Sequence, residues 1–268
     1  MKTERNKGSV IYLSHGGGPL PLLGDKGHTK MIQFMHQIAQ KIKKPEAIIV
    51  ISAHWEESIP TIIGNSEPSL LYDYYGFPEE AYSIQYNLPG NPVLTQKVQE
   101  LLKIAGIDAK IENNRGFDHG VFIPLMLMYP DGSIPTVQIS LIKGLDPEKH
   151  IEMGKALKNL LHENILIIGS GFSFHNINAF TWNNDNIRDH KNDLFQDQLI
   201  KTCTNSSSLE DKIKNLIEWE KFPNSRYCHP REEHLLPLHV CCGISDSAGK
   251  VIFDDYILGK RAIALLWE

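Results

Sequence analysis

Histidines are the side chains in this sequence whose positions suggest chemistry. The 268-residue chain contains twelve of them, and several stand beside glycine or proline. His15 follows the apolar run VIYLS and precedes three glycines, His54 follows AIIVIS, and His175 comes soon after ILIIGS. Neutral imidazole is the commonest side-chain ligand of Zn, Fe and Cu, and a catalytic site needs about three protein ligands with a position left open. These residue types therefore suggest a metal site.

Three more histidines are candidates for the same site. His119 lies between an aspartate and a glycine, at the start of an apolar run of helical length. His229 and His234 share the segment HPREEHLLPLHV, and we expect His234 in the first turn of a helix that runs to Cys242. Six histidines are too many for one metal, so some must be ligands and others acid–base groups. Spacing alone does not assign them, although His15 and His54, at the ends of neighbouring strands, form the best pair and His234 would complete a facial set.

The remaining histidines and the glycine run have simpler interpretations. We interpret six histidines as structural or solvated: His28, His36, His150, His162, His190 and His239. The glycines at 16–18 could cradle a phosphate, but no Lys-Ser/Thr pair follows and the spacing is not that of a P-loop or a dinucleotide fingerprint. We expect instead that they let the chain turn sharply and leave room for a ligand close to the backbone.

The elements that must position these residues alternate along the chain. Strands are expected at 10–14, 47–52, 136–141, 165–170, 251–253 and 262–266, and helices at 29–43, 91–105, 147–161, 186–202 and 209–218. This alternation predicts one α/β domain over 1–268, with a central, mixed but mostly parallel sheet flanked by helices. Ligands of open α/β sheets bind outside the carboxyl ends of the strands. His15, His54 and His175 are therefore expected to converge on one rim.

Composition and charge narrow the class of protein. The formal net charge is -5 and the sequence has no basic stripe, so nucleic acid is not an expected partner. The polar N-terminus lacks the apolar segment of a signal peptide, and no apolar run approaches the roughly 18 residues of a membrane span. The four cysteines form no CxxC pair. This pattern predicts a reduced, cytoplasmic chain without a membrane partner.

Six stretches, in order, resemble the class III extradiol ring-cleavage dioxygenases, and most closely their 4,5-DOPA extradiol dioxygenase branch. The stretches run from about residue 9 to the C-terminus and are SHGGGPLPLLGD, ISAHWEE, YDYYGFPEEAY, RGFDHGVFIPLMLMYP, GSGFSFHN and REEHLLPL. The resemblance implies metal ligands at His15, His54 and His234, and catalytic roles for His119 and His175. It also implies Fe(II) for activity, with Zn(II) possible in the isolated protein, and a small-molecule catechol and O2 as reactants.

Two positions have alternatives within this resemblance. Better-known members of the protocatechuate type use two histidines and a glutamate, so Glu233 is the alternative third ligand. We favour His234, and we keep His229 as a reserve ligand without a fixed role.

The implied chemistry assigns further residues. His175 would take a proton from the catechol, and His119 would hydrogen-bond the dioxygen or a substrate oxygen. Asp118 or a backbone carbonyl would fix the tautomer of His119. Arg115 is a candidate for binding a substrate carboxylate, and Tyr75, in an aromatic loop, is a candidate substrate contact.

Two other functions would use the same ligands. A zinc hydrolase would activate water at the open position of the metal. A non-enzymatic, metal-binding interaction protein would need no acid–base pair. Metal dependence separates the first from a dioxygenase, and variants of His119 and His175 separate the second.

Overall fold

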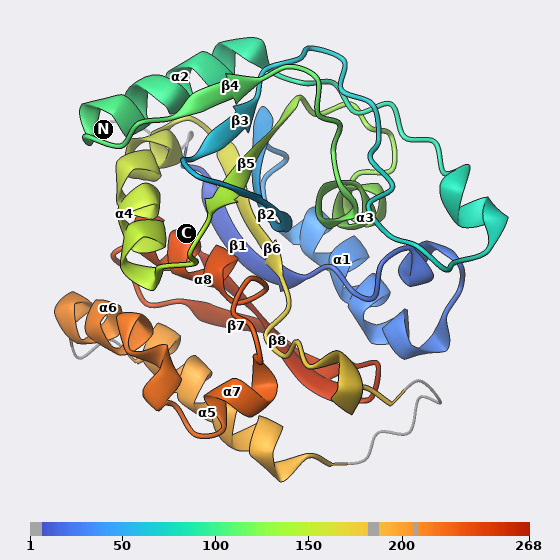
Figure 1. Cartoon of the computed structure of the whole chain (residues 1–268), viewed down its shortest axis with the longest axis vertical. Coiled ribbons are helices and arrows are strands. Elements are labelled where there is room, and N and C mark those ends of the chain that lie inside the picture. Colours follow the sequence, from blue (N-terminus) through green and yellow to red (C-terminus); the bar gives the residue numbers. More distant parts are fainter. Residues whose placement is uncertain (1–6, 182–187, 206–207) are drawn as a thin grey trace.

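An eight-stranded sheet organises the chain. The computed structural model describes residues 7–181, 188–205 and 208–268. Within them the strand order is β4-β3-β5-β2-β6-β1-β8-β7 (Figure 1). The strands are β1 (Ser9–Ser14), β2 (Ala47–Glu57), β3 (Thr61–Ile63), β4 (Lys110–Glu112), β5 (Thr136–Ile142), β6 (Ile165–Gly171), β7 (Lys250–Ile257) and β8 (Lys260–Trp267). The four central strands β5, β2, β6 and β1 are parallel, whereas β8 and β7 are antiparallel to their neighbours.

Helices cover both faces of this sheet. The helices are α1 (Thr29–Lys41), α2 (Pro92–Ile104), α3 (His119–Met128), α4 (Pro147–Leu157), α5 (His190–Thr204), α6 (Leu209–Ile217), α7 (Ser225–Cys228) and α8 (Leu236–Ile244). In Figure 1, α1 and α3 lie on one face of the central strands and α4 and α8 on the other, while α5, α6 and α7 lie beyond the β8–β7 edge. The predicted single α/β domain with a mixed, mostly parallel sheet is confirmed.

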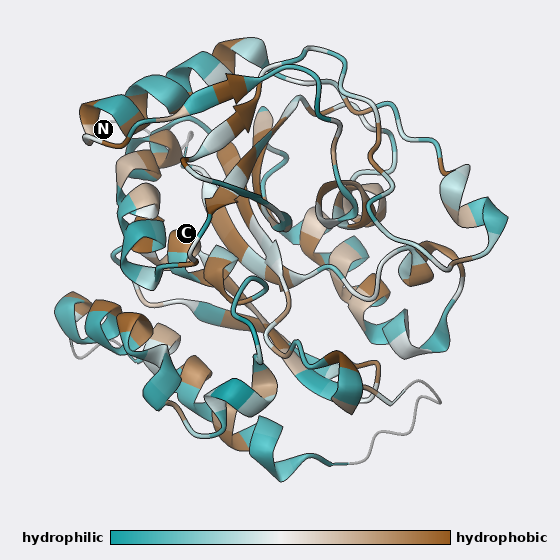
Figure 2. Cartoon of the chain, in the orientation of Figure 1, coloured by the Kyte–Doolittle hydropathy of each residue, from teal (hydrophilic) through white to brown (hydrophobic). Residues whose placement is uncertain are grey.

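The central strands are buried on both faces, as their apolar sequences predict. Residues 47–53 of β2 and 165–171 of β6 are all buried. Hydrophobic residues accordingly concentrate in the middle of the sheet and on the helix sides that face it (Figure 2). A parallel strand covered by helices on both sides needs such a continuous apolar run. This rigid centre fixes where the strands end, and the candidate histidines follow those ends.

β2 is longer and less regular than the sequence predicts. It pairs with β5 at Ile51↔Ile139 and again at Glu56↔Leu141. Between these pairs β2 contributes the four residues 52–55, whereas β5 contributes only Ser140. The additional residues interrupt the ladder and redirect side chains, as bulges do beside active sites. His54 therefore lies within the irregular part of β2 and not after its end.

Other predicted boundaries shift by a few residues. The helix predicted at 147–161 ends at Leu157 and continues as a 3-10 turn, Lys158–His162. His234 lies in the turn that precedes α8, and not in its first helical turn. The short strands β3 and β4 were not predicted, because three residues are too few to show a periodic hydrophobic pattern. The polar N-terminal residues and the start of the helix predicted at 186–202 lie outside the described residues.

The buried His150 provides a pH test of the fold. Its Nδ1 donates to the Asp146 carbonyl at 2.7 Å, and its Nε2 accepts from the Ile142 amide at 3.1 Å. Burial lowers the pKa of His150 to about 4 in the folded protein. In the unfolded chain the same side chain becomes protonated near pH 6.5. Between pH 6.5 and 4 the unfolded chain therefore binds a proton at this residue that the folded protein does not bind. The free energy of unfolding falls across this range as the pH is lowered, by at most about 1.4 kcal/mol per pH unit for His150.

We predict that His150→Gln reduces the slope of the free energy of unfolding against pH between pH 6.5 and 4. Urea unfolding at several pH values in this window measures both slopes. The variant should also be less stable at pH 7, because glutamine replaces a fitted ring. Equal slopes in the two proteins would show that His150 does not resist protonation in the fold.

Candidate metal centre

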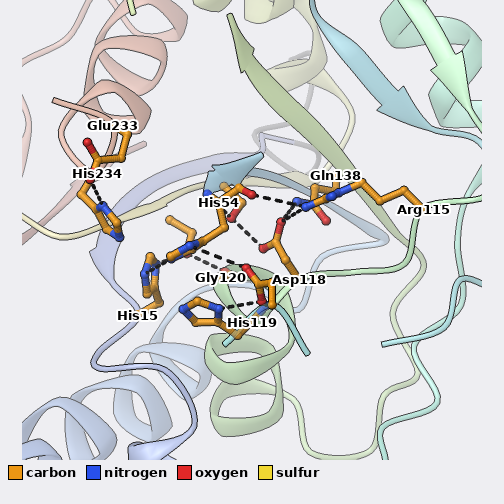
Figure 3. Close-up of polar contacts among 12 residues, drawn as sticks. His15, His54, Arg115, Asp118, His119, Gly120, Gln138, Glu233 and His234 are labelled. Carbon is orange, nitrogen blue, oxygen red and sulfur yellow. Dashed lines mark hydrogen bonds and ion pairs between the residues drawn. The ribbon is translucent and has the colours of Figure 1, made fainter. Parts of the chain in front are cut away.

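Five histidines from distant parts of the chain meet at one end of the sheet, and Figure 3 shows His15, His54, His119 and His234 there. His15 directly follows β1, His54 is in β2, His119 begins α3, His175 lies just past β6, and His234 precedes α8. Nitrogen atoms of His15, His54 and His119 all lie within 4.8 Å of one another, as do the ligand atoms of His175, Glu233 and His234. The predicted convergence on the carboxyl rim of the sheet is confirmed.

Ser170 fixes the tautomer of His15. The Ser170 hydroxyl donates to the Gly120 carbonyl at 2.5 Å, so its proton is already used. The oxygen of Ser170 lies 3.0 Å from His15 Nδ1 and can therefore only accept there. His15 must carry its proton on Nδ1, which leaves a lone pair on Nε2. That lone pair faces the interior of the histidine cluster.

Two carboxylates hold the outer nitrogens of the other four histidines. Asp73 Oδ1 lies 2.7 Å from His119 Nδ1, and Asp73 Oδ2 lies 3.6 Å from His54 Nδ1. Glu233 Oε1 lies 2.9 Å from His234 Nδ1 and 3.0 Å from His175 Nδ1. A carboxylate accepts hydrogen bonds and favours an N–H on the nitrogen that it faces.

Both carboxylates are held ionised. Burial opposes ionisation of Asp73, but the hydrogen bond from His119 and the proximity of the His119 and His54 imidazoles lower the pKa of Asp73 to about 2. Burial acts the same way on Glu233, and the hydrogen bond from His175 holds the pKa of Glu233 below its usual range. The Nδ1 atoms therefore face negative charge, and the three within hydrogen-bond distance, those of His119, His175 and His234, favour an Nδ1–H ring with its lone pair on Nε2.

This arrangement brings lone pairs together. His15 Nε2 and His54 Nε2 lie only 2.9 Å apart (Figure 3). With the proton of His15 on Nδ1, its Nε2 accepts a hydrogen bond from a neutral His54 ring protonated on Nε2, and the two nitrogens can bind one cation when His54 carries its proton on Nδ1. Burial, reinforced by the neighbouring histidines, holds the pKa values of His15, His54 and His234 well below the usual value. The rings are thus neutral, which is the form that binds a metal ion.

Ring spacing tests which histidines suit one ion. A nitrogen about 2.1 Å from a metal puts its ring centroid about 3.3 Å away, so ligands at right or tetrahedral angles have centroids about 4.7–5.4 Å apart. The pairs among His15, His54 and His234 are separated by 4.8, 4.9 and 5.2 Å. The His54–His119 and His175–His234 pairs, at 3.8 and 3.4 Å, are too close to share an ion in this way. The spacing of His15, His54 and His234 therefore suits one ion, and His119, 5.3 Å from His15 but only 3.8 Å from His54, fits beside His15 and not beside His54.

Glu233 and His229, the two reserve ligands, have other partners. Glu233 occupies the Nδ1 side of His234, away from the Nε2 atoms that point inward (Figure 3). His229 is fully buried, lies outside both clusters, and is 2.9 Å from the Ser173 carbonyl through Nε2. The contacts favour a supporting role for both residues.

Asp118 does not orient the His119 ring, contrary to one of the two sequence-based alternatives. Its buried carboxylate accepts from Ser52 at 2.7 Å, from Arg115 at 3.1 Å, and from Gln138. Burial and the nearby Asp73 carboxylate raise the pKa of Asp118. Asp73, which the sequence analysis did not single out, takes the place beside His119 Nδ1.

Arg115 and Ser52 use this network to hold the backbone of His54. The Ser52 hydroxyl accepts from the His54 amide at 3.2 Å, and Arg115 Nη2 donates to the His54 carbonyl at 3.3 Å. The Arg115 guanidinium also lies over the Trp55 ring, 4.8 Å from its centroid. The Arg115 guanidinium therefore already binds groups of the protein itself. These contacts do not support its predicted role in binding a substrate carboxylate.

The aromatic loop presents Tyr74 to the site and Tyr75 to solvent. The Tyr74 ring lies 5.7 Å from the His119 ring, edge to face, whereas Tyr75 is 91% exposed. Tyr75 remains a predicted substrate contact at the surface. Tyr74 is the aromatic neighbour of the histidines that the sequence analysis did not choose.

The glycine turn after His15 makes room for protein side chains. Gly16 has φ +86°, which favours glycine, and a Cβ there would lie 2.8 Å from the His28 ring. His28 Nε2 accepts from the Gly17 amide at 2.9 Å, and Phe77 contacts Gly18. His28 and Phe77 thus occupy the space that a Cβ on Gly16 or Gly18 would need, and the expectation that the turn also leaves room for a ligand stays a prediction.

Gly171 lets the backbone of His234 approach β6. A Cβ on Gly171 would lie 2.1 Å from the His234 carbonyl oxygen. That oxygen accepts from the Tyr12 hydroxyl and from the Phe172 amide, each at 3.0 Å. The carboxyl ends of β1 and β6 thus fix His234 although it is more than 60 residues away in the sequence.

The chain is similar in sequence to known proteins over most of its length. Residues 9–262 match the family described as the catalytic LigB subunit of aromatic ring-opening dioxygenase. The dioxygenase tasH of Hapsidospora irregularis is 38% identical, with 99% of this chain and 87% of that protein covered. The 4,5-DOPA dioxygenase extradiol of Beta vulgaris is 36% identical, with 93% and 91% covered.

A solved structure has the same fold. The crystal structure of the uncharacterized protein JW3007 from Escherichia coli K12 superposes with a TM-score of 0.79 at 26% identity, over 98% of this chain and all of that one. Among the described residues, no helix combines the length and apolar character that crossing a membrane requires.

The hydrogen bonds that join His15 to Ser170 and Ser170 to the Gly120 carbonyl, here called the relay, lead to a prediction about metal binding. Ser170→Ala removes the acceptor for His15 Nδ1–H, so the ring loses its fixed tautomer. We expect metal affinity to fall by about 10–100-fold, measured by competition titration with Zn(II) or Co(II). Ser245→Ala is the matched control, because this buried serine hydrogen-bonds the Ser247 hydroxyl just past the C-terminus of α8, at the end of that helix opposite to His234. Wild-type affinity in Ser170→Ala would contradict the relay.

Proposed function

The chain belongs to the LigB family of aromatic ring-opening dioxygenases, and we propose that it is an Fe(II)-dependent extradiol dioxygenase of catechols. The observation that carries the proposal is the set of imidazoles anchored through Nδ1, with His15 and His54 facing each other through Nε2 at 2.9 Å. Membership of the family makes the protein an oxygenase. The metal and the substrate are the parts that we propose.

His15, His54 and His234 are the proposed ligands. Their neutral rings and their centroid separations of 4.8–5.2 Å suit one ion, and three protein ligands leave positions open for reactants. Fe(II) in this site would supply the redox chemistry that O2 activation requires, which Zn(II), with its filled d shell, cannot supply. Zn(II) fits the same donors and can occupy the isolated protein.

His175 is the proposed base for the catechol. Its Nδ1 faces Glu233 Oε1 at 3.0 Å, which leaves the Nε2 lone pair as the acceptor. A proton taken from a catechol hydroxyl would reside on Nε2, and the Glu233 carboxylate would stabilise the resulting cation. The same histidine can later return the proton to an oxygen of the opening ring.

His119 is the proposed second acid–base residue. Its Nδ1 faces Asp73 Oδ1 at 2.7 Å, so in the neutral form the His119 ring would present an acceptor at Nε2. It can hydrogen-bond a hydroxyl of the substrate as it stands, and dioxygen only when Nε2 is protonated. His119 and His175 each lie beside one proposed ligand, and would flank the open side of the site.

The proposed substrate is a DOPA-like catechol, and the product a ring-opened semialdehyde. Support comes from the relatives in Beta vulgaris and Mirabilis jalapa, both named 4,5-DOPA dioxygenase extradiol. Tyr75 and Arg115 remain proposed substrate contacts, and Tyr74 is added because it packs on His119. The names of the relatives from Hapsidospora irregularis, Beta vulgaris and Mirabilis jalapa favour a dioxygenase over the zinc hydrolase and the binding protein.

The remaining proposals concern the extent and surroundings of the enzyme. We assign the catalytic domain to the whole chain, 1–268. We assign it to the cytoplasm because all four cysteines are free and buried, which suits a reducing compartment. No nucleic acid or membrane partner is part of the proposal.

Oxygen uptake tests the reaction. The protein reconstituted with Fe(II) without air should consume O2 when a catechol is added, and mass spectrometry should find a product heavier by both oxygen atoms. A panel of catechols identifies the preferred substrate. The Zn(II) protein should be inactive in the same assay. Absence of O2 uptake with every catechol would overturn the proposal, and hydrolysis supported by Zn(II) would replace it with a hydrolase.

Single substitutions test the assigned roles. His15→Ala, His54→Ala and His234→Ala should each lose most of the bound metal, because two remaining ligands hold it poorly. His119→Ala and His175→Ala should retain metal and lose turnover. Metal content by mass spectrometry and the catechol assay provide the two readouts. Loss of metal in His119→Ala, with His234→Ala retaining it, would exchange the roles of these two histidines.

A further inference from the structure

Asp73 reaches the histidine cluster from a loop outside the sheet. It lies between β3 (Thr61–Ile63) and the 3-10 turn Glu79–Tyr82. The loop is tied to the chain just before α3, because the Leu71 amide donates to the Phe117 carbonyl at 2.7 Å. Asp73 is therefore brought next to the first turn of α3, which begins with His119.

The contacts of Asp73 involve two histidines with different proposed roles. Its Oδ1 accepts from the backbone amide of His119 at 3.0 Å and from His119 Nδ1 at 2.7 Å. Its Oδ2 lies 3.6 Å from His54 Nδ1. One carboxylate thus faces the outer nitrogens of a proposed base and a proposed metal ligand, whose rings lie 3.8 Å apart.

The same loop forms part of the wall of the site. Tyr74, the next residue, places its ring 5.7 Å from the His119 ring, and Phe77 lies against Gly18 in the turn after His15. Tyr74 and Phe77 also pack against each other, with ring centroids 5.5 Å apart. The loop therefore contacts the surroundings of His15, His54 and His119 together.

We propose that Asp73 is a positioning residue that fixes the Nδ1–H form of His119, aligns it with His54, and so couples the aromatic loop to the acid–base group. The role in catalysis rests on the proposed function, whereas the effect on the His119 tautomer does not. The alternative is that Asp73 only anchors the aromatic loop. In that case replacing Asp73 would disturb Tyr74 and substrate binding but would leave the tautomer of His119 unchanged.

Two variants separate the charge of Asp73 from its hydrogen bond. Asp73→Asn keeps an oxygen that can accept from His119, but places an NH2 group towards His54. Asp73→Ala removes both contacts. Glu79→Gln is the matched control, because it changes an exposed carboxylate in the same segment. Thermal melting of each variant establishes that it is folded.

The first readout is the tautomer of His119 in the Zn(II)-loaded protein. Long-range ¹H–¹⁵N spectra of ¹⁵N-histidine protein distinguish Nδ1–H from Nε2–H rings, and His119→Gln identifies the signal. We expect wild type and Glu79→Gln to show His119 as Nδ1–H. Asp73→Ala should lose this preference, and Asp73→Asn should retain it in part.

The second readout is kinetic. In the Fe(II) protein, Asp73→Ala should lower kcat by about 10–100-fold with a much smaller change in KM, and Asp73→Asn should lie between it and wild type. An unchanged His119 signal in Asp73→Ala, or a raised KM with unchanged kcat, would overturn the proposal. If no catechol supports O2 uptake but the His119 signal still changes in Asp73→Ala, the oxygenase proposal fails and the positioning role stands.

Discussion

Two imidazole nitrogens that face each other at 2.9 Å are the feature on which the rest of the site depends. His15 and His54 make this contact through Nε2, and the proton of His15 is held on Nδ1 by Ser170. At this distance a neutral His54 ring protonated on Nε2 donates to His15 Nε2, whereas protonation of His54 on Nδ1 turns both Nε2 lone pairs towards a shared metal ion. Burial keeps these rings in the neutral form that binds a metal ion. The carboxylates of Asp73 and Glu233 likewise face the Nδ1 atoms of the other three rings, those of His119, His175 and His234.

The fold supplies this geometry from rigid parts. His15 follows β1 directly, and the irregular segment of β2 directs His54 to the same rim. The His234 carbonyl is bonded to Tyr12 and Phe172, at the ends of the two central strands. Each proposed ligand is thus held through its backbone as well as its ring. Preorganisation of this kind limits the reorganisation needed when reactants bind.

Much of the fold and the membership of the site followed from sequence patterns. The apolar runs VIYLS, AIIVIS and ILIIGS can only be central strands of a covered sheet, and this placed His15, His54 and His175 on one rim. The supporting residues were harder to predict. Ser170 and Asp73 act through hydrogen bonds to residues 155 and 46 positions away, and nothing local marks them. The packing around the glycine turn was equally hard to predict, because the His28 and Phe77 side chains beside Gly16 and Gly18 come from other segments.

The most direct test of the account is a crystal structure with the metal located by anomalous diffraction. Data collected at the iron or zinc absorption edge from metal-loaded crystals would show which nitrogens surround the ion. The account predicts one ion bonded to Nε2 of His15, His54 and His234, with His119 and His175 unbonded beside it. An ion bonded to His119, or to the carboxylate of Glu233, would contradict it.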